Sequence, residues 1–321
     1  MPATANAPLR VLIAEAEHGL YAELLRQQAP ELELCSSDQP AELAELAEYA
    51  ASCPLWLGQP DLLAPLLRQG SRPQWLQSTW AGITPLLAKD LPTDYALTRA
   101  VGIFGQLMAE YVLCHLLAHE RQLFAALASQ VEQRWDNRLP RSLAGRKVLI
   151  VGTGDIGLSV AQFLAPFGIE LLGIASRPRN LPPFRQVAGL DELPRLVGET
   201  DYLINLLPDT PSTRDIYDAV LFAACKPSAL FINAGRGVAV VDQALISALQ
   251  QGQLAGAVID VCREEPLPAG HPFWDAPRLL LTGHSSAPTD PHLLVQLFVD
   301  NLARWQACHA LRGRVDFVRG Y

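Results

Sequence analysis

Short apolar runs alternate with segments of helical periodicity along most of this chain. Over residues 1–98 the pattern predicts helices at 19–28, at 41–51 and within DLLAPLLRQG. It predicts strands between them, at 9–14, at 32–35, and within LWLG and PQWLQSTWAGI. Strands that alternate with helices at this spacing indicate an α/β unit with a parallel sheet.

The second part of the chain repeats this alternation after one long helical segment. The pattern predicts a single helix over 104–130, and a helix of such length usually bridges domains or packs against a partner subunit. Further strands are predicted in KVLIVG, IELLGIAS, YLINLLP, LFINAG, AGAVIDV and RLLLTGH. After His284 the chain is again helical to about Leu311.

This pattern and the length of 321 residues predict two domains rather than one compact unit. One covers 1–98 and is completed by 289–321; the other covers 99–288 and includes the long helix. The predicted fold class is α/β, with two Rossmann-like or flavodoxin-like domains, doubly wound parallel sheets and a cleft between them.

Charge and composition exclude several classes of protein. The net charge of −8 argues against nucleic-acid binding, which needs a positive surface. No window approaches the roughly 18 apolar residues of a membrane span, and the N-terminus lacks the pattern of a signal peptide. Six cysteines are scattered without a CxxC pair, so we expect reduced, mostly buried thiols in a cytoplasmic protein.

The best local signal is a glycine-rich turn between a strand and a helix, in VLIVGTGDIGLSVAQFLAPFG. The first glycine allows a tight turn, the second lets the backbone approach a pyrophosphate, and the third lets helix and strand pack closely. The helix N-terminus supplies amide donors and a favourable dipole. With both flanks correct, this pattern favours dinucleotide binding over a simple turn, by Gly152, Thr153, Gly154, Asp155, Ile156 and Gly157.

The segment GIASRPRN indicates which dinucleotide is preferred. Ser176 lies about 20 residues beyond the glycine loop, where an acid would hold the ribose 2′-hydroxyl of NAD. A serine hydroxyl and the Arg177 guanidinium would instead bind a 2′-phosphate, and Arg179 could add a second positive charge. The alternative is a solvated basic loop. We favour NADP over NAD as the cofactor.

Three later segments place reactive side chains after strands of the same sheet. Arg236 follows one strand, Asp260 and Glu265 follow the next, and His284 follows a third. Together they offer an arginine for a carboxylate, a histidine for proton transfer and a carboxylate to keep that histidine charged. Taken singly, Arg236 could cap a helix, Glu265 could be a surface charge and His284 could be a loop histidine. Their joint placement at strand ends favours an active site.

GTGDIG, LINLLPDTPSTRDI, FINAGRGVAVVDQAL, GAVIDVCREEPLP and the late histidine resemble the D-isomer-specific 2-hydroxyacid dehydrogenases over roughly Arg99 to Pro288. SRPR and the VDxxRGY ending resemble the glyoxylate/hydroxypyruvate reductase A group of that family, which uses NADPH. The resemblance implies a substrate-binding domain at 1–98 with 289–321, and an NAD(P)-binding domain at 99–288.

The resemblance also implies roles for residues at matching positions. Arg236 would bind the carboxylate and carbonyl oxygen of a 2-keto acid. His284, hydrogen-bonded to Glu265, would protonate that oxygen as hydride arrives. Asp260 would orient the nicotinamide carboxamide. The cofactor site would also be lined by Leu207, Pro208 and Ala234, and the substrate carboxylate would be held by the loop of Trp80, Ala81 and Gly82.

Several positions depart from the family pattern. Gly283 stands where a proline is usual, and Ile83 and Thr84 replace the usual Val-Asp. These changes affect the substrate side and leave the residues implied for cofactor binding and proton transfer intact.

Two other features of the long helical segment have simpler explanations. His115 and His119 stand four residues apart beside Glu120, but without a third ligand motif we predict a helix–helix contact and no metal. Trp135 is either a hinge packing residue or, by the same resemblance, a residue that reaches a neighbouring subunit's active site.

The sequence therefore predicts a cytoplasmic, NADPH-dependent reductase of small 2-keto acids such as glyoxylate and hydroxypyruvate, forming a homodimer. One alternative is a reductase for a bulkier 2-keto acid that uses NADH. Another is a non-catalytic protein that senses dinucleotides, although such a protein would not need the proton donor.

Overall fold

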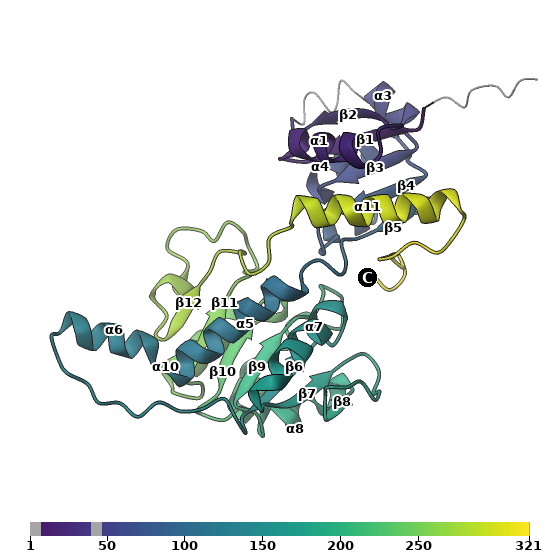
Figure 1. Cartoon of the computed structure of the whole chain (residues 1–321). Helices are drawn as coiled ribbons and strands as arrows, with labels where there is room; N and C mark the ends of the chain where they lie inside the picture. Colours follow the sequence, from purple (N-terminus) through teal and green to yellow (C-terminus); the bar gives the residue numbers. More distant parts are fainter. Residues whose placement is uncertain (1–7, 40–46, 321) are drawn as a thin grey trace, which may run out of the picture. The chain divides into compact units, whose positions relative to one another are not determined.

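The computed structural model describes residues 8–39 and 47–320. The chain divides into two compact units, one formed by 1–103 with 289–321 and the other by 104–288. Each contains one parallel β-sheet covered by helices (Figure 1). The predicted α/β fold class is therefore confirmed.

The first unit is built on a five-stranded parallel sheet in the order β2-β1-β3-β4-β5. Its strands are β1 (Arg10–Ala14), β2 (Glu33–Ser37), β3 (Leu55–Gly58), β4 (Trp75–Ser78) and β5 (Ala96–Thr98). Its α-helices are α1 (His18–Gln28), α3 (Ala47–Ser52), α4 (Pro60–Arg68) and α11 (Pro291–Gln306).

Helix α11 joins the first unit although it comes from the end of the chain. The Phe298 ring stacks on Trp75 with 4.9 Å between ring centroids. The Asn301 side chain is fully buried and donates to Gln77 Oε1 at 3.2 Å. The aromatic stack and the neighbouring buried hydrogen bond together fix α11 at one place on the sheet.

The second unit is built on a seven-stranded parallel sheet in the order β12-β11-β10-β9-β6-β7-β8. Its strands are β6 (Lys147–Val151), β7 (Glu170–Ile174), β8 (Gln186–Ala188), β9 (Tyr202–Asn205), β10 (Leu230–Asn233), β11 (Gly256–Ile259) and β12 (Leu279–Leu281). Its α-helices are α5 (Gly105–Glu120), α6 (Leu123–Val131), α7 (Asp155–Leu164), α8 (Leu193–Val197), α9 (Ala219–Ala224) and α10 (Asp242–Gln250).

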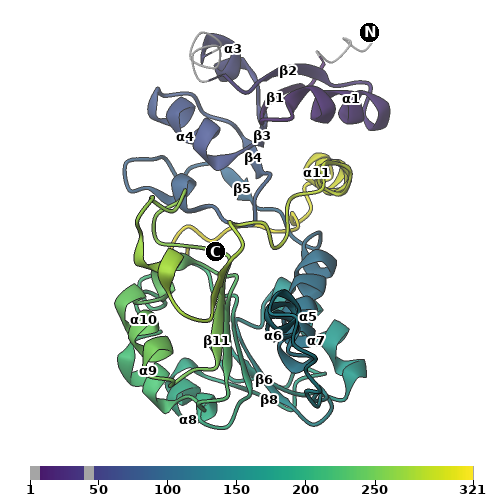
Figure 2. The same ribbon diagram turned by 90° about the vertical axis from the view of Figure 1, so that its left-hand side faces the viewer.

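The central strands of this sheet are apolar on both faces because helices cover both. Figure 2 shows α8, α9 and α10 on one side of the strands and α5 and α7 on the other. Within β6, Leu149 and Val151 join one core cluster while Val148 and Ile150 join the other. The period of two along a strand explains this division, and burial on both faces explains the unbroken apolar runs in the sequence.

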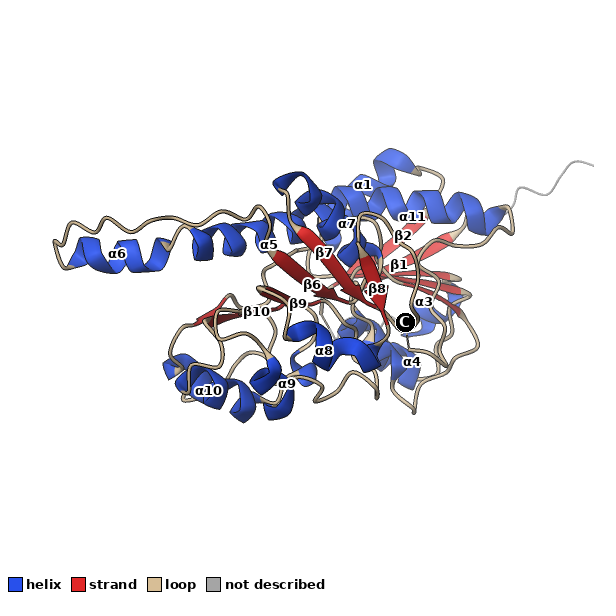
Figure 3. Ribbon diagram, turned by 90° about the horizontal axis from the view of Figure 1, so that it is seen from below, coloured by secondary structure: helices blue, strands red, loops and turns tan. Residues whose placement is uncertain are grey.

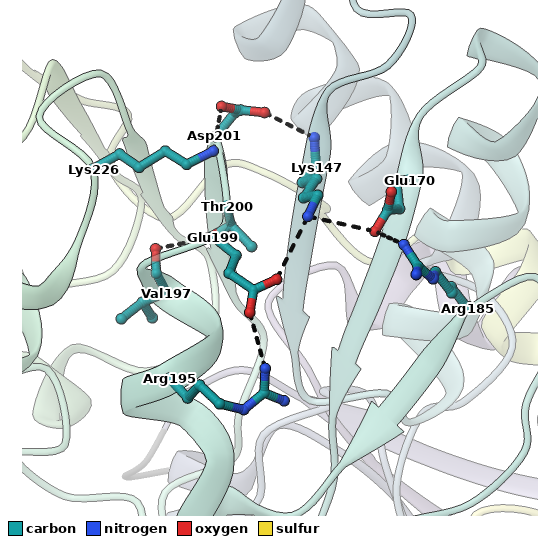
Figure 4. Close-up of polar contacts among 9 residues, drawn as sticks. All are labelled: Lys147, Glu170, Arg185, Arg195, Val197, Glu199, Thr200, Asp201 and Lys226. Atoms are coloured by element: carbon teal, nitrogen blue, oxygen red, sulfur yellow. Dashed lines mark hydrogen bonds and ion pairs between the residues drawn. The ribbon is translucent and has the colours of Figure 1, made fainter.

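The amino ends of these strands are held by a network of charged side chains. Figure 4 shows the Lys147 ammonium between Glu170 and Glu199, at 3.9 and 3.5 Å. Asp201 accepts from Lys226 at 3.0 Å and from the Lys147 backbone N–H at 2.9 Å. The carboxyl ends of the strands, where open α/β sheets bind ligands, lie at the opposite edge.

The predicted single helix over 104–130 is wrong. Helix α5 ends at Glu120, Gln122 adopts the left-handed conformation with φ 53°, and α6 begins at Leu123. The left-handed region is uncommon for residues other than glycine, so the periodicity of the sequence gave no sign of this break. Figure 3 shows α6 extending away from the sheet of its unit.

Other differences concern short or terminal elements. The sequence pattern missed β5 and β8, which have three residues each. Helix α11 ends at Gln306 rather than near Leu311. The predicted helix over 41–51 lies partly outside the described residues, and α3 begins at Ala47.

The expectation of mostly buried thiols is wrong. Only Cys53 and Cys225 are buried, whereas Cys114 and Cys308 are exposed.

Candidate active site

The glycine loop joins β6 to α7, and the structure explains each of its three glycines. Gly152 has a φ of +106°, and a Cβ there would lie 2.8 Å from the Leu206 carbonyl oxygen. At Gly157 a Cβ would lie only 2.0 Å from the Gly152 oxygen, so the turn could not close. At Gly154 a Cβ would meet nothing within 4 Å. The first and third glycines therefore shape the loop, and the second leaves its backbone open to a ligand.

The basic loop follows β7, the strand next to β6. Ser176 and Arg177 are exposed. Arg179 instead turns back, and its Nη2 donates to the carbonyl oxygen of Thr153 at 2.5 Å and to the Thr153 hydroxyl at 3.1 Å. The structure thus gives Arg179 a part in holding the glycine loop, and its contact with a phosphate stays a prediction.

Three buried polar side chains stand at the carboxyl ends of adjacent strands. Asn205 ends β9, Asn233 ends β10, and Asp260 follows β11; all are at most 2% exposed. Asn205 Nδ2 donates to Asn233 Oδ1 at 2.8 Å. Asn233 Nδ2 in turn reaches the carbonyl oxygens of Arg236 and Val261, at 3.4 and 3.3 Å. This pair therefore ties together the loops that leave the strand ends.

Asp260 holds the loop that carries His284. Its carboxylate accepts from the backbone N–H groups of Ser285 and Ser286 at 2.9 and 3.2 Å, and from the Thr282 hydroxyl at 2.7 Å. His284 has a φ of 57°, in the left-handed region that a histidine rarely adopts. These contacts offset the cost of that conformation.

The His284 imidazole forms an ion pair with Glu265. The distance from Nδ1 to Glu265 Oε2 is 2.7 Å, and the other carboxylate oxygen accepts from the Cys262 N–H at 2.7 Å. The hydrogen bond to Glu265 raises the pKa of His284 above its ordinary 6.5, although burial opposes the shift. Burial alone would raise the pKa of Glu265, but hydrogen bonds from His284 and Cys262 outweigh it and lower that pKa. Both groups therefore favour the charged form, and Nε2 of His284 remains available to donate a proton.

Arg236 lies at the end of β10, in a turn that only glycines allow. A Cβ at Gly235 would lie 2.9 Å from the Leu207 nitrogen, and one at Gly237 would lie 2.0 Å from the Cys262 backbone. The Arg236 Nη1 donates to the Gly235 carbonyl oxygen at 2.6 Å. Its positive charge lowers the pKa values of both Glu265 and His284, so the guanidinium lies within electrostatic reach of the pair.

A cavity of about 630 Å³ adjoins the pair. Apolar side chains form much of its wall, and it is lined by Ile259, Asp260, Cys262, Glu265, Pro266, Leu267, Trp274, Leu281, Gly283 and His284. Its size is in the range of small-molecule sites.

The predicted substrate loop belongs to the first unit. Trp80 follows β4, and its backbone N–H and carbonyl are both bonded to the Ser78 hydroxyl, at 3.0 and 3.1 Å. Ala81 and Gly82 are partly exposed. The other predicted site residues belong to the second unit.

Sequence reasoning missed four residues that shape the site: Asn205, Asn233, Thr282 and Tyr111. A signal for the first two was present, because in YLIN and LFIN an apolar strand ends in asparagine. Nothing in the sequence connects Tyr111 with Thr282, which lie 171 positions apart and 2.9 Å apart in space.

Among the described residues, no group of three or more His, Cys, Asp or Glu side chains could hold a metal ion. The His115 ring packs edge-on against Tyr111 and the His119 ring against Tyr202. Within the same residues, no helix has the length and apolar character needed to cross a membrane.

Comparison with known proteins gives consistent matches. The sequence model described as "D-isomer specific 2-hydroxyacid dehydrogenase, NAD binding domain" matches residues 113–286. Glyoxylate/hydroxypyruvate reductase A from Yersinia enterocolitica is 36% identical over 249 residues, which is 75% of this chain and 79% of the relative.

Solved structures agree with this similarity. A D-isomer specific 2-hydroxyacid dehydrogenase family protein from Aeromonas salmonicida has a TM-score of 0.89 and 35% identity, over 97% of this chain and 100% of that one. An NADPH-dependent glyoxylate/hydroxypyruvate reductase from Sinorhizobium meliloti, in complex with NADP and sulfate, has a TM-score of 0.84 and 30% identity, over 97% of this chain and 99% of that one.

Proposed function

This chain belongs to the D-isomer-specific 2-hydroxyacid dehydrogenases, which are NAD(P)-dependent enzymes, and we propose that it reduces small 2-keto acids with NADPH. Glyoxylate and hydroxypyruvate are the favoured substrates, because similar proteins carry those names. The observation that carries the proposal is the His284–Glu265 ion pair beside Arg236 at the carboxyl edge of the sheet. We place the enzyme in the cytoplasm because its cysteines are scattered without pairing motifs.

In the proposed reaction Arg236 binds the substrate carboxylate and the neighbouring carbonyl oxygen. The backbone of Trp80, Ala81 and Gly82 holds the carboxylate as well. When bound, the reduced nicotinamide supplies the hydride that the carbonyl carbon accepts. His284 donates its Nε2 proton to the carbonyl oxygen, which becomes the hydroxyl of the product. Glu265 stabilises the charged imidazole before transfer, and Arg236 stabilises the negative charge that develops on the oxygen.

The residues present fit a dinucleotide. The open backbone at Gly154 and the N-terminus of α7 suit a pyrophosphate. Ser176 and Arg177 are exposed beyond β7, where a 2′-phosphate is recognised in this fold. Leu207, Pro208 and Ala234 follow β9 and β10 at the same edge and are proposed to line the nicotinamide site, with Asp260 bonded to its carboxamide.

Substitution of Arg177 by alanine tests the cofactor and the reaction class together. We expect wild-type turnover of glyoxylate and hydroxypyruvate to favour NADPH, and Arg177→Ala to raise KM for NADPH about 10- to 100-fold while leaving NADH almost unchanged. The loss would come from the charge-assisted hydrogen bonds to the 2′-phosphate. The measurement is oxidation of each reduced cofactor, followed by its absorbance.

The control is Arg185→Ala. Arg185 is also an exposed arginine, but it pairs with Glu170 at the amino edge of the sheet, so both KM values should stay unchanged. If the wild type preferred NADH, the proposed reaction class would stand. The basic loop would then be a solvated loop without a role in cofactor preference. Absence of turnover with any 2-keto acid would favour a sensing protein.

A second candidate is reduction of a bulkier 2-keto acid. The cavity beside His284 favours it, because Leu267, Trp274 and Leu281 could cover an apolar substrate side chain. Turnover of phenylpyruvate in preference to glyoxylate would support this alternative.

We further propose a homodimer formed through an arm, defined here as α6 with residues 132–141. Apolar side chains are exposed along the arm at Leu123, Phe124, Leu127, Val131, Trp135 and Leu139. Trp135 is 91% exposed. At its base, Glu120 is buried and paired with Arg141 and Arg146, both at 2.9 Å, so the arm is anchored to its own unit. The arm is therefore a fixed, apolar surface that a second copy of the chain could bind. A two-fold axis would let each arm cover the other subunit.

Replacement of Leu139 by glutamate is expected to convert this dimer to a monomer, because the side chain is 85% exposed and would place a charge in the apolar contact. Light scattering after gel filtration measures the mass. Val318→Glu is the matched control: Val318 is 96% exposed but lies in the first unit, outside the arm, and the dimer should persist. A wild-type protein that is already monomeric would contradict the proposal.

A further inference from the structure

The proposed proton donor is held by a hydrogen-bond chain that begins on a distant helix. Tyr111 in α5 lies 2.9 Å from the Thr282 hydroxyl, which lies 2.7 Å from Asp260 Oδ1. An ionised carboxylate can only accept, so the single proton of the Thr282 hydroxyl goes to Asp260. Tyr111 must therefore donate to Thr282. Burial raises the pKa of Tyr111, which keeps its phenol protonated.

The chain ends on the backbone around His284. The same Asp260 carboxylate accepts from the N–H groups of Ser285 and Ser286, and the His284 N–H donates to the Asp260 carbonyl oxygen at 2.7 Å. Gly283 and His284 both have positive φ, 64° and 57°. A histidine in this conformation is held there by its surroundings, and the hydrogen bonds of Asp260 to the loop contribute to holding it here.

We propose that Thr282 and Tyr111 are positioning residues for proton transfer: by fixing the Asp260 carboxylate they fix the His284 loop and hence the contact of His284 with Glu265. This inference rests on the proposed role of His284. Neither residue touches the reacting atoms. Their effect is exerted on the protonation of His284, which the contact with Glu265 favours.

Charged groups act on the His284 imidazole in opposite directions. Glu265 and Asp260 favour the charged imidazole, and Arg236 opposes it. Asp260 in turn acts on His115, whose ring packs edge-on against Tyr111 at 4.5 Å between centroids. Burial lowers the pKa of His115, which keeps it neutral and makes it a packing partner of the tyrosine.

The test replaces Thr282 by valine, which keeps the shape and removes the hydroxyl. We expect kcat/KM for glyoxylate with NADPH to fall about 10-fold, as for one lost hydrogen bond to a charged group. The contact with Glu265 raises the pKa of His284, so its loosening should lower that pKa. Activity needs the charged form, so its decline at alkaline pH should begin at a lower pH than in the wild type. Thr282→Ser, which keeps the hydroxyl, should behave as the wild type.

Two further variants separate positioning from stability. In the double variant Tyr111→Phe with Thr282→Val, both partly buried partners of this contact become apolar and no phenol is left without an acceptor. Thermal stability should therefore be higher than in Thr282→Val alone, while the lowered pKa of His284 persists. Thr200→Val is the matched control, because Thr200 is a buried threonine at the amino edge whose hydroxyl donates to the Val197 carbonyl oxygen at 3.2 Å. That change should cost stability and leave the pH profile unmoved.

The pKa of His284 is also measured directly, by NMR titration of the imidazole resonance that is missing in His284→Gln. An unchanged pKa in Thr282→Val, whatever the loss of activity, would overturn the inference. Full activity of His284→Gln would instead overturn the proposed function. Even then, a lowered pKa of His284 in Thr282→Val would show that Thr282 positions the loop. The two failures are therefore distinguishable.

Discussion

Replacing His284 by glutamine is expected to lower kcat for glyoxylate reduction by a factor of about 10³, within the usual range for loss of a general acid. Glutamine is close to histidine in length and can still bond Glu265, so the loop should keep its shape. It cannot donate a proton from a charged group. The Kd for NADPH should stay unchanged, because the glycine loop and the basic loop are untouched.

Steady-state kinetics and fluorescence titration of NADPH measure the two quantities separately. The matched control is His309→Gln, an exposed histidine of the first unit, which should change neither. If His284→Gln retained wild-type kcat, the proton would have to come from another group, and the assignment of His284 would be wrong.

The same prediction has a pH dependence with a definite sign. Reduction requires the charged imidazole, so kcat/KM should be constant at low pH and fall as the pH rises through the pKa of His284. Because the hydrogen bond to Glu265 raises that pKa above 6.5, the fall should lie on the alkaline side of that value. Oxidation of the hydroxy acid needs the neutral imidazole and should show the opposite profile.

Sequence patterns predicted the fold well where the spacing of apolar residues follows directly from which positions are buried. The strands around the glycine loop carry apolar runs on both faces because helices cover both faces of the sheet, and such runs are plain in the sequence. The break at Gln122 could not be predicted. It depends on a left-handed residue that is not glycine, and the buried Glu120 just before it is paired with Arg141 and Arg146 from the returning segment.

The residues of the candidate site also fall into those that the sequence predicted and those that it did not. Arg236, Glu265 and His284 could be found because each follows a strand in a motif with chemical meaning. The residues that hold them could not, because their roles depend on contacts between distant segments. Asp260 shows the difference: its place after a strand suggested a ligand contact, while the structure adds that its carboxylate is already bonded to Thr282, Ser285 and Ser286.

Replacing Arg236 by glutamine is expected to lower kcat/KM for glyoxylate by a factor of about 10² to 10³, because a paired charge and its hydrogen bonds to the substrate are lost together. Arg236→Lys should recover only part of the loss, since an ammonium keeps the charge but lacks the planar fork that binds a carboxylate at two points. The Kd for NADPH should not change. Arg195→Gln, which removes an exposed arginine paired with Glu192 and Glu199, is the control.

The pH profile of the Arg236→Gln variant separates its role from a general disturbance of the site. The charge of Arg236 lowers the pKa of His284, so its removal should raise that pKa and move the alkaline fall of activity to higher pH. A loosened loop would move the fall the other way, because His284 would lose its contact with Glu265. A shift to lower pH in Arg236→Gln would therefore mean that Arg236 supports the loop, and that the substrate carboxylate is bound elsewhere.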